Sequence, residues 1–124
     1  MGRSSAEPKA READVLTRAF FRAAGELGLS QQAASRVLGL SPATVSRLVA
    51  GRTLSPSSKE GEIALQFLRI YRSLDTLVGG NAEQARAWLT ADNRHLGGVP
   101  AELIASIPGI VHVAEYLDAM RGRL

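Results

Sequence analysis

Residues 31–51 read QQAASRVLGLSPATVSRLVAG, a stretch that predicts two short helices meeting at a tight corner. Between the helices, Gly39 can adopt the left-handed conformation that ends a helix, Ser41 can cap the next helix, and Pro42 suits a first helical position. Apolar residues recur at helical spacing on both sides of this break and predict one buried face on each helix: Ala34, Val37, Leu38, Val45, Leu48 and Val49. Together these signals predict a helix-turn-helix.

The second helix of this corner presents a short polar surface without acidic residues, which suits the major groove of DNA. We predict that Thr44 and Arg47 contact base edges and that Gln31, Arg36 and Arg52 hold the phosphate backbone. The full set of residues that we expect to face DNA is Gln31, Arg36, Ser41, Ala43, Thr44, Ser46, Arg47 and Arg52.

Charge favours this interpretation over plain structural packing, in which helix-turn-helix corners also occur. From Leu27 through Lys59 the chain carries four basic and no acidic residues. Up to residue 58 there are eight basic and four acidic residues, and after it seven basic and eight acidic residues. A positive region without acids favours binding to duplex DNA that weakens as salt is added. Aromatic residues make up only 5% of the chain, which disfavours binding to single strands by stacking.

Length and composition bound the rest. With 124 residues, the chain can bury one modest core or two small ones. It has no cysteine and therefore no disulfide, and it shows neither a signal peptide nor an apolar run of membrane-spanning length. We expect a cytoplasmic protein without membrane contact.

The apolar spacing predicts an all-α fold, since no alternating strand pattern occurs. We expect a flexible N-terminal arm over 1–10, a helix-turn-helix DNA-binding domain over 11–58 with a first helix at 11–27, and a small multi-helix domain over 59–124. In the latter, helices are predicted at 59–78, 82–90 and 100–104, and a last helix after a break at 106–109. The helix at 59–78 is apolar on two faces, which indicates either a core shared by both domains or a self-association surface.

Catalysis is not expected. The two histidines, His95 and His112, lack the spacing of paired metal ligands or of an acid and base on one helix face. Gly97 and Gly98 follow no strand and precede no Lys-Ser/Thr pair, so they do not form a phosphate-binding loop. We predict neither an enzyme nor a metal or cofactor site.

The C-terminal third carries a family resemblance. Its motifs are Trp88-Leu89, Asn93, the LGG at 96–98, Pro100, Leu103, Gly109 and the closing VAEYLDAMRGRL. This stretch resembles the toxin-binding domain of the Xre/MbcA/ParS antitoxins, and the upstream corner is similar to Xre and Cro/C1-type repressor modules. The two occur in the order usual for that family.

The resemblance implies an antitoxin that neutralises a RES-domain, NAD-degrading toxin by obstructing its active site and that represses its own operon. The toxin-binding residues that it implies are Trp88, Asn93, Leu96, Gly97, Gly98, Pro100, Arg121, Gly122, Arg123 and Leu124. From the residues alone, the Arg-Gly-Arg-Leu end is typical of a frayed helix end and a lone tryptophan is typical of a core.

Two alternatives remain open. A stand-alone repressor would use the C-terminal helices for dimerisation or effector binding, and an all-helical adaptor would not bind DNA at all. For a DNA-binding protein of this type we expect a homodimer whose two recognition helices read a palindromic operator.

Overall fold

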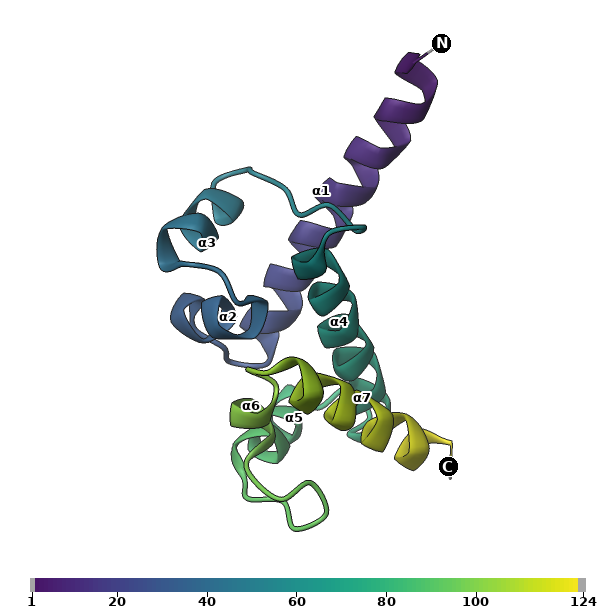
Figure 1. The fold of residues 1–124 in the computed structure, drawn as a ribbon. Helices are drawn as coiled ribbons and strands as arrows, with labels where there is room; N and C mark the ends of the chain where they lie inside the picture. Colours follow the sequence, from purple (N-terminus) through teal and green to yellow (C-terminus); the bar gives the residue numbers. More distant parts are fainter. Residues whose placement is uncertain (1, 123–124) are drawn as a thin grey trace.

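The computed structural model describes the backbone of residues 2–122 and the side chains of residues 7–122. Within that range the chain forms seven helices and no β-strand, apart from one isolated antiparallel bridge between Asn93 and Gly98 (Figure 1). The prediction of an all-α fold is confirmed. The helices are α1 (Gly2–Glu26), α2 (Gln31–Leu38), α3 (Pro42–Val49), α4 (Lys59–Leu77), α5 (Ala82–Thr90), α6 (Pro100–Leu103) and α7 (Ile107–Arg121).

The corner between α2 and α3 forms through the predicted local interactions. Gly39 ends α2 with a φ of +70°, in the left-handed region that favours glycine. The Oγ of Ser41 accepts a hydrogen bond from the backbone N–H of Thr44 at 3.2 Å, and Pro42 is the first residue of α3. The observed helix caps therefore confirm the predicted helix-turn-helix.

The buried faces of this corner agree with the predicted pattern except at its end. Val45 and Leu48 are buried, whereas Val49 is 51% exposed. The expectation for Val49 was wrong because successive helical residues lie about 100° apart, and only the stripe through Val45 and Leu48 faces the body of the protein.

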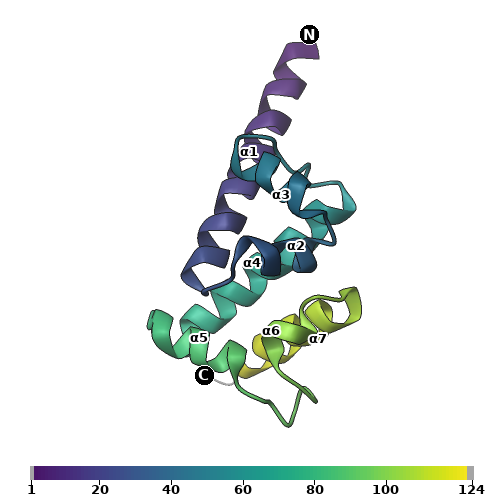
Figure 2. The same ribbon diagram turned by 90° about the vertical axis from the view of Figure 1, so that its left-hand side faces the viewer.

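The first helix is longer than the sequence predicts. It begins at Gly2, and Pro8 lies inside it, so the backbone of residues 2–10, within the arm that the sequence analysis expects to be flexible, is helical. Residues 7–10 are exposed and pack against no core, so they carry no apolar spacing from which a helix could be predicted. That spacing starts only at Ala13. This first part of α1 projects beyond the other helices (Figures 1 and 2).

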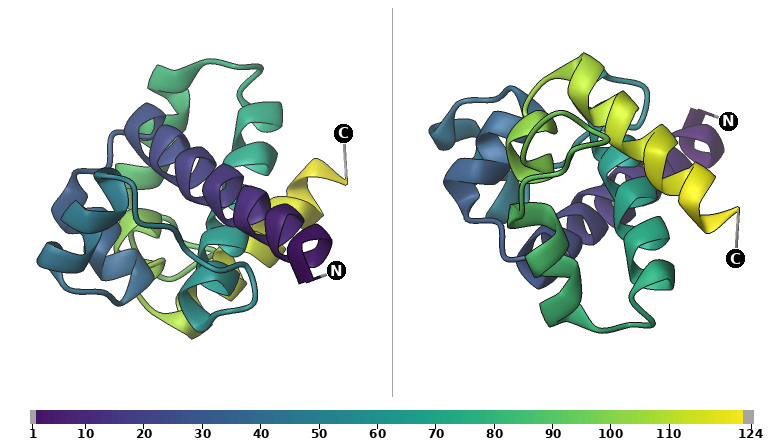
Figure 3. Two further views of the ribbon diagram at one scale, coloured as in Figure 1. Left: turned by 90° about the horizontal axis from the view of Figure 1, so that it is seen from above. Right: turned by 90° about the horizontal axis from the view of Figure 1, so that it is seen from below.

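One hydrophobic cluster runs through both halves of the chain, with α4 at its centre. Helix α4 makes its most extensive contacts with α7 and α1, and the ring of Phe67 lies 5.0 Å from that of Phe20 on α1. Figure 3 shows α4 between the N-terminal and C-terminal helices. Of the two interpretations of the apolar helix at 59–78, the shared core is confirmed.

Polar contacts near the end of α1 reinforce this shared core. Tyr71 on α4 donates a hydrogen bond to the carboxylate of Glu26, which raises the pKa of Tyr71 to about 12. Arg86 on α5 donates to the backbone carbonyl of Glu26 at 3.0 Å. The end of α1 is thus joined to both α4 and α5.

The C-terminal helices begin at capping side chains. Asn81 caps α5, and Ser106 caps α7 by accepting a hydrogen bond from the backbone N–H of Gly109 at 3.1 Å. The predicted break at 106–109 is therefore shorter than expected, because residues 107–109 already form the first turn of α7. Pro108 is the second residue of α7, where a proline is well tolerated because its missing backbone N–H would have no partner within the helix.

Close packing at the start of α4 makes a stability prediction. A Cβ on Gly61 would lie 1.9 Å from the carbonyl oxygen of Ser55, a backbone atom that cannot move aside alone. We expect Gly61→Ala to lower the free energy of unfolding by about 1–3 kcal/mol in urea denaturation. Gly25→Ala is the matched control, since a Cβ there meets nothing within 4 Å, and should stabilise the helix by about 0.5–1 kcal/mol. Equal urea midpoints for both variants would contradict this packing.

Candidate functional site

The outward surface of α3 is polar and accessible. Ala43, Ser46 and Arg47 are exposed, and Thr44 is half-buried. Ser41 and Thr44 share a hydrogen bond between their hydroxyl oxygens at 2.9 Å. Because each hydroxyl has one donor and two acceptor positions, both keep the capacity for a further contact. The structure thus places Ala43, Thr44, Ser46 and Arg47 together on one short helix, which lies at the left-hand edge of the fold in Figure 1.

The flanking basic residues divide between two places. Arg52 follows α3 directly, and its backbone N–H donates to the carbonyl of Arg47 at 2.9 Å. Arg36 lies on α2, where it lines a pocket with Lys59 and Ile107 between α2 and the starts of α4 and α7. Gln31 is exposed at the start of α2.

Electrostatics leaves this surface positive. In the part of the chain that the structure describes, no ion pair involves Arg36, Arg47 or Arg52. Their exposed guanidinium groups are therefore free to make bidentate contacts with phosphate or guanine.

A buried hydroxyl that the sequence analysis missed fixes the connection after α3. The Oγ1 of Thr17 on α1 accepts a hydrogen bond from the backbone N–H of Leu54 at 2.8 Å and donates to the carbonyl of Ala13 at 2.7 Å. Thr17 is 3% exposed. The available signal was a polar residue on the apolar face of the first helix, between Leu16 and Phe20. This contact ties the segment that follows α3 to the core.

In the C-terminal half, Asn93 closes the loop between α5 and α6. Its side-chain Oδ1 accepts a hydrogen bond from the backbone N–H of Leu96 at 3.1 Å, and its backbone N–H donates one to the carbonyl of Gly98 at 2.9 Å. Gly97, with a φ of +80°, makes the turn. Asn93 therefore has a structural role in shaping this loop.

Three aromatic rings from separate elements form a stack beside this loop. The ring of Trp88 on α5 lies 6.4 Å from that of Tyr116 on α7, with an interplanar angle of 19°. On Tyr116, the ring of His95 stacks at 6.0 Å and 24°. Trp88 and Tyr116 are half-buried, and His95 is exposed. The sequence analysis did not relate Tyr116 and His95 to Trp88, because no local spacing connects residues so far apart in the chain.

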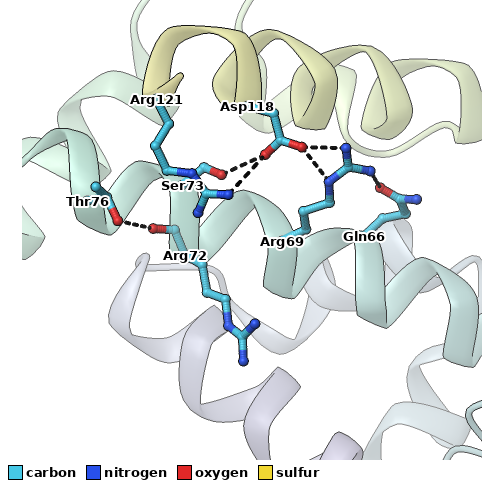
Figure 4. A network of polar contacts seen from close by, with 7 residues as sticks. All are labelled: Gln66, Arg69, Arg72, Ser73, Thr76, Asp118 and Arg121. Atoms are coloured by element: carbon cyan, nitrogen blue, oxygen red, sulfur yellow. Dashed lines mark hydrogen bonds and ion pairs between the residues drawn. The ribbon is translucent and has the colours of Figure 1, made fainter. Parts of the chain in front are cut away.

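Near the carboxyl end, Asp118 on α7 accepts contacts from three side chains (Figure 4). Arg69 donates from Nε at 2.7 Å and Ser73 from Oγ at 2.9 Å, both from α4. Arg121 lies 4.0 Å away and is exposed, as is Gly122. The predicted site residues Arg123 and Leu124 lie outside the described residues.

Two family models match the chain, one after the other. Residues 8–69 match the antitoxin Xre-like helix-turn-helix domain, and residues 73–123 match the antitoxin Xre/MbcA/ParS C-terminal toxin-binding domain. The chain is an antitoxin of the Xre family. No curated protein matches it significantly. The first match ends at residue 69 and the second begins at residue 73, both inside α4, the helix around which the shared core is built.

The residues that the resemblance implies as toxin contacts differ in how far they are buried. Leu96 is 7% exposed and Pro100 is fully buried in the free chain, and their assignment as toxin contacts stays a prediction. Both are apolar and belong to the packing beneath the loop. The residues that remain accessible or half-buried are Trp88, Asn93, Gly97, Gly98, Arg121 and Gly122.

The Asp118 contacts make the stability of the antitoxin depend on pH. The hydrogen bond from Arg69, followed by that from Ser73, lowers the pKa of Asp118 from its ordinary 3.8. A depressed folded-state pKa adds stability above the ordinary value, and this stability is lost as the pH falls through the lower value.

We therefore expect Asp118→Asn to cost about 1–2 kcal/mol of unfolding free energy near pH 7, because two hydrogen bonds to a charge are weakened at a partly exposed site. The difference from the unmodified protein should shrink as the pH falls below 3.8 and through the lowered pKa of Asp118, because the folded carboxylate then gains a proton. Urea midpoints near neutral pH and through the acid range measure this, with exposed Asp92→Asn as the matched control. An unchanged difference at low pH would show that Asp118 does not act through its charge.

In the described range, no helix is long and apolar enough to cross a membrane. Nor do the described residues contain a group of three or more His, Cys, Asp or Glu that could hold a metal ion.

Proposed function

We propose that the antitoxin binds operator DNA through α3 and represses its own operon, and that it neutralises a RES-domain, NAD-degrading toxin encoded beside it. The observation that carries the proposal is the exposed, acid-free α3 surface on the same compact core as a toxin-binding domain. Neither role needs a reaction on this chain, and both belong in the cytoplasm.

For DNA, the proposal assigns base contacts to Thr44 and Arg47 on α3. Ser41, Ala43 and Ser46 line the groove, while Gln31, Arg36 and Arg52 hold phosphates. A homodimer would place two copies of α3 about 34 Å apart, one turn of the duplex, so that a palindromic operator is read twice. The free guanidinium groups described above support this assignment.

For the toxin, the proposal assigns recognition to the accessible side of the Asn93 loop with Trp88 and to the chain end from Arg121 to Leu124. The chain end would obstruct the entrance of the toxin active site. Two guanidinium groups flanking a glycine, followed by leucine, can contact an anionic pocket and an apolar recess together. The exposed Gly97, where a Cβ would meet nothing within 4 Å, allows close approach of a partner, and Gly98 continues this loop.

Co-expression with the product of the adjacent gene tests the toxin half of this proposal. The antitoxin is expected to co-purify with that protein and to restore both growth and cellular NAD in cells that make it. If the two proteins do not co-purify and NAD stays depleted, the chain does not neutralise this partner. The stand-alone repressor would then account for any operator binding that is observed.

A further inference from the structure

Helix α3 is held to the body of the protein at few points. Of its eight residues only Val45 and Leu48 are buried, and its most extensive packing is against α2. In the segment 50–58 that follows, which the structure describes throughout, Leu54 alone is buried, with 5% of its surface exposed. The orientation of α3 therefore depends on the corner at its start and on the anchor at Leu54 beyond its end.

The buried hydroxyl of Thr17 holds this anchor in place. The backbone N–H of Leu54 donates to Thr17 Oγ1 at 2.8 Å, and the same hydroxyl donates to the carbonyl of Ala13 at 2.7 Å. Among the described side chains, no other hydrogen bond joins α1 to segment 50–58. Without this hydroxyl, the N–H of Leu54 would be left in the core without a partner, which is costly.

We propose that Thr17 is a positioning residue for sequence-specific DNA binding, because it holds the end of α3 in the orientation that lets Arg47 reach base edges. This inference rests on the DNA binding of the proposed function and adds a residue that touches no DNA. The connection to the anchor is short. Arg52, whose backbone N–H donates to the carbonyl of Arg47 at 2.9 Å, lies only two positions before Leu54. A shift of Leu54 therefore reaches the last turn of α3.

Contacts to bases and contacts to phosphates respond differently to such a shift. A hydrogen bond to a base edge needs a donor–acceptor distance of about 2.7–3.2 Å and a nearly linear geometry, so a displacement of about 1 Å breaks it. The attraction between a guanidinium group and a phosphate falls off gradually with distance and carries no sequence information. Loss of the anchor should therefore reduce the preference for the operator more than the general affinity for duplex DNA.

Thr17→Val tests the anchor, since valine keeps the shape of the side chain and removes the hydroxyl. Fluorescence anisotropy is measured at a temperature where every variant is folded by circular dichroism. We expect operator binding to weaken about 5- to 10-fold and binding to a shuffled duplex to weaken less than about 2-fold. Amide hydrogen exchange over residues 47–54 should become faster. Thr17→Ser keeps the hydroxyl and should retain most of the operator affinity and the slow exchange.

Ser73→Ala is the matched control. Ser73 is also fully buried, and its Oγ donates across the fold to Asp118 at 2.9 Å, but in the C-terminal half. This variant should melt at a lower temperature and leave both operator binding and exchange over 47–54 unchanged.

The outcomes separate the inference from the proposed function. Unchanged operator affinity or unchanged exchange in Thr17→Val would overturn the inference while the proposed DNA binding stands. An equal loss of operator affinity in Ser73→Ala or in Thr17→Ser would also overturn it, since the effect would then not come from the Thr17 hydroxyl. If the unmodified chain does not prefer its operator to the shuffled duplex, the proposed DNA binding fails and the inference fails with it.

Discussion

Removal of residues 121–124 is expected to abolish neutralisation of the toxin while operator binding is retained. The core residues of α7 are Ile110, Val113, Ala114 and Leu117, all upstream of the cut, so the truncated chain keeps its packing. The only described contact that the deletion removes from the Asp118 network is Arg121 at 4.0 Å, a weak and exposed pair. The loss would therefore fall on the partner surface and not on the fold.

The measurement is growth and NAD content in cells that make the toxin, together with operator binding by the purified truncated antitoxin. Cells with the truncated chain should grow no better than cells without an antitoxin. Arg121→Ala is the companion variant, which separates the described arginine from the rest of the chain end. Full protection by a stably folded truncated chain would remove the chain end from the toxin contact and leave Trp88 and the Asn93 loop as its site.

Arg47→Ala is expected to weaken operator binding by about 1–3 kcal/mol, or about 5- to 150-fold. Arg47 is exposed on α3, and no ion pair of the described residues holds it, so the substitution removes a DNA contact without breaking an internal one. The loss should be largest on the operator if Arg47 contacts a guanine. It should be uniform across sequences, with a salt slope smaller by about one, if Arg47 contacts phosphate.

Fluorescence anisotropy with the operator and with a shuffled duplex distinguishes these cases. Arg94→Ala is the matched control, because Arg94 is also exposed but lies in the loop after α5. Its binding should equal that of the unmodified antitoxin. If Arg47→Ala binds both duplexes as tightly as the control does, Arg47 is not part of the recognition surface.

The sequence specified the corner of α2 and α3 well because its determinants are local. A glycine, a serine and a proline act on the backbone within a few residues of themselves, and each is found in the predicted role at Gly39, Ser41 and Pro42. The same holds for the caps at Asn81 and Ser106. Position on a helix is also local, but which side the body of the protein covers is not, and Val49 was misplaced for that reason.

Features that depend on distant contacts could not be predicted. The change of charge near residue 58 suggested a domain boundary, yet α4 buries Phe67 against Phe20 and joins both halves in one core. Burial of Leu96 and Pro100 depends on how the loop closes through Asn93, and the stack of Trp88, Tyr116 and His95 depends on how α5 and α7 meet. The start of a helix is also hard to predict from apolar spacing where the helix packs against no core, as in the first part of α1.

Titration of the purified antitoxin onto a labelled duplex from its own promoter, repeated at increasing salt, tests most directly whether α3 is a DNA-reading surface. We predict tighter binding to this duplex than to a shuffled one, and an affinity that falls steeply and linearly on a logarithmic salt scale. Absence of binding in dilute buffer, or equal binding to both duplexes, would contradict sequence-specific DNA recognition by this protein.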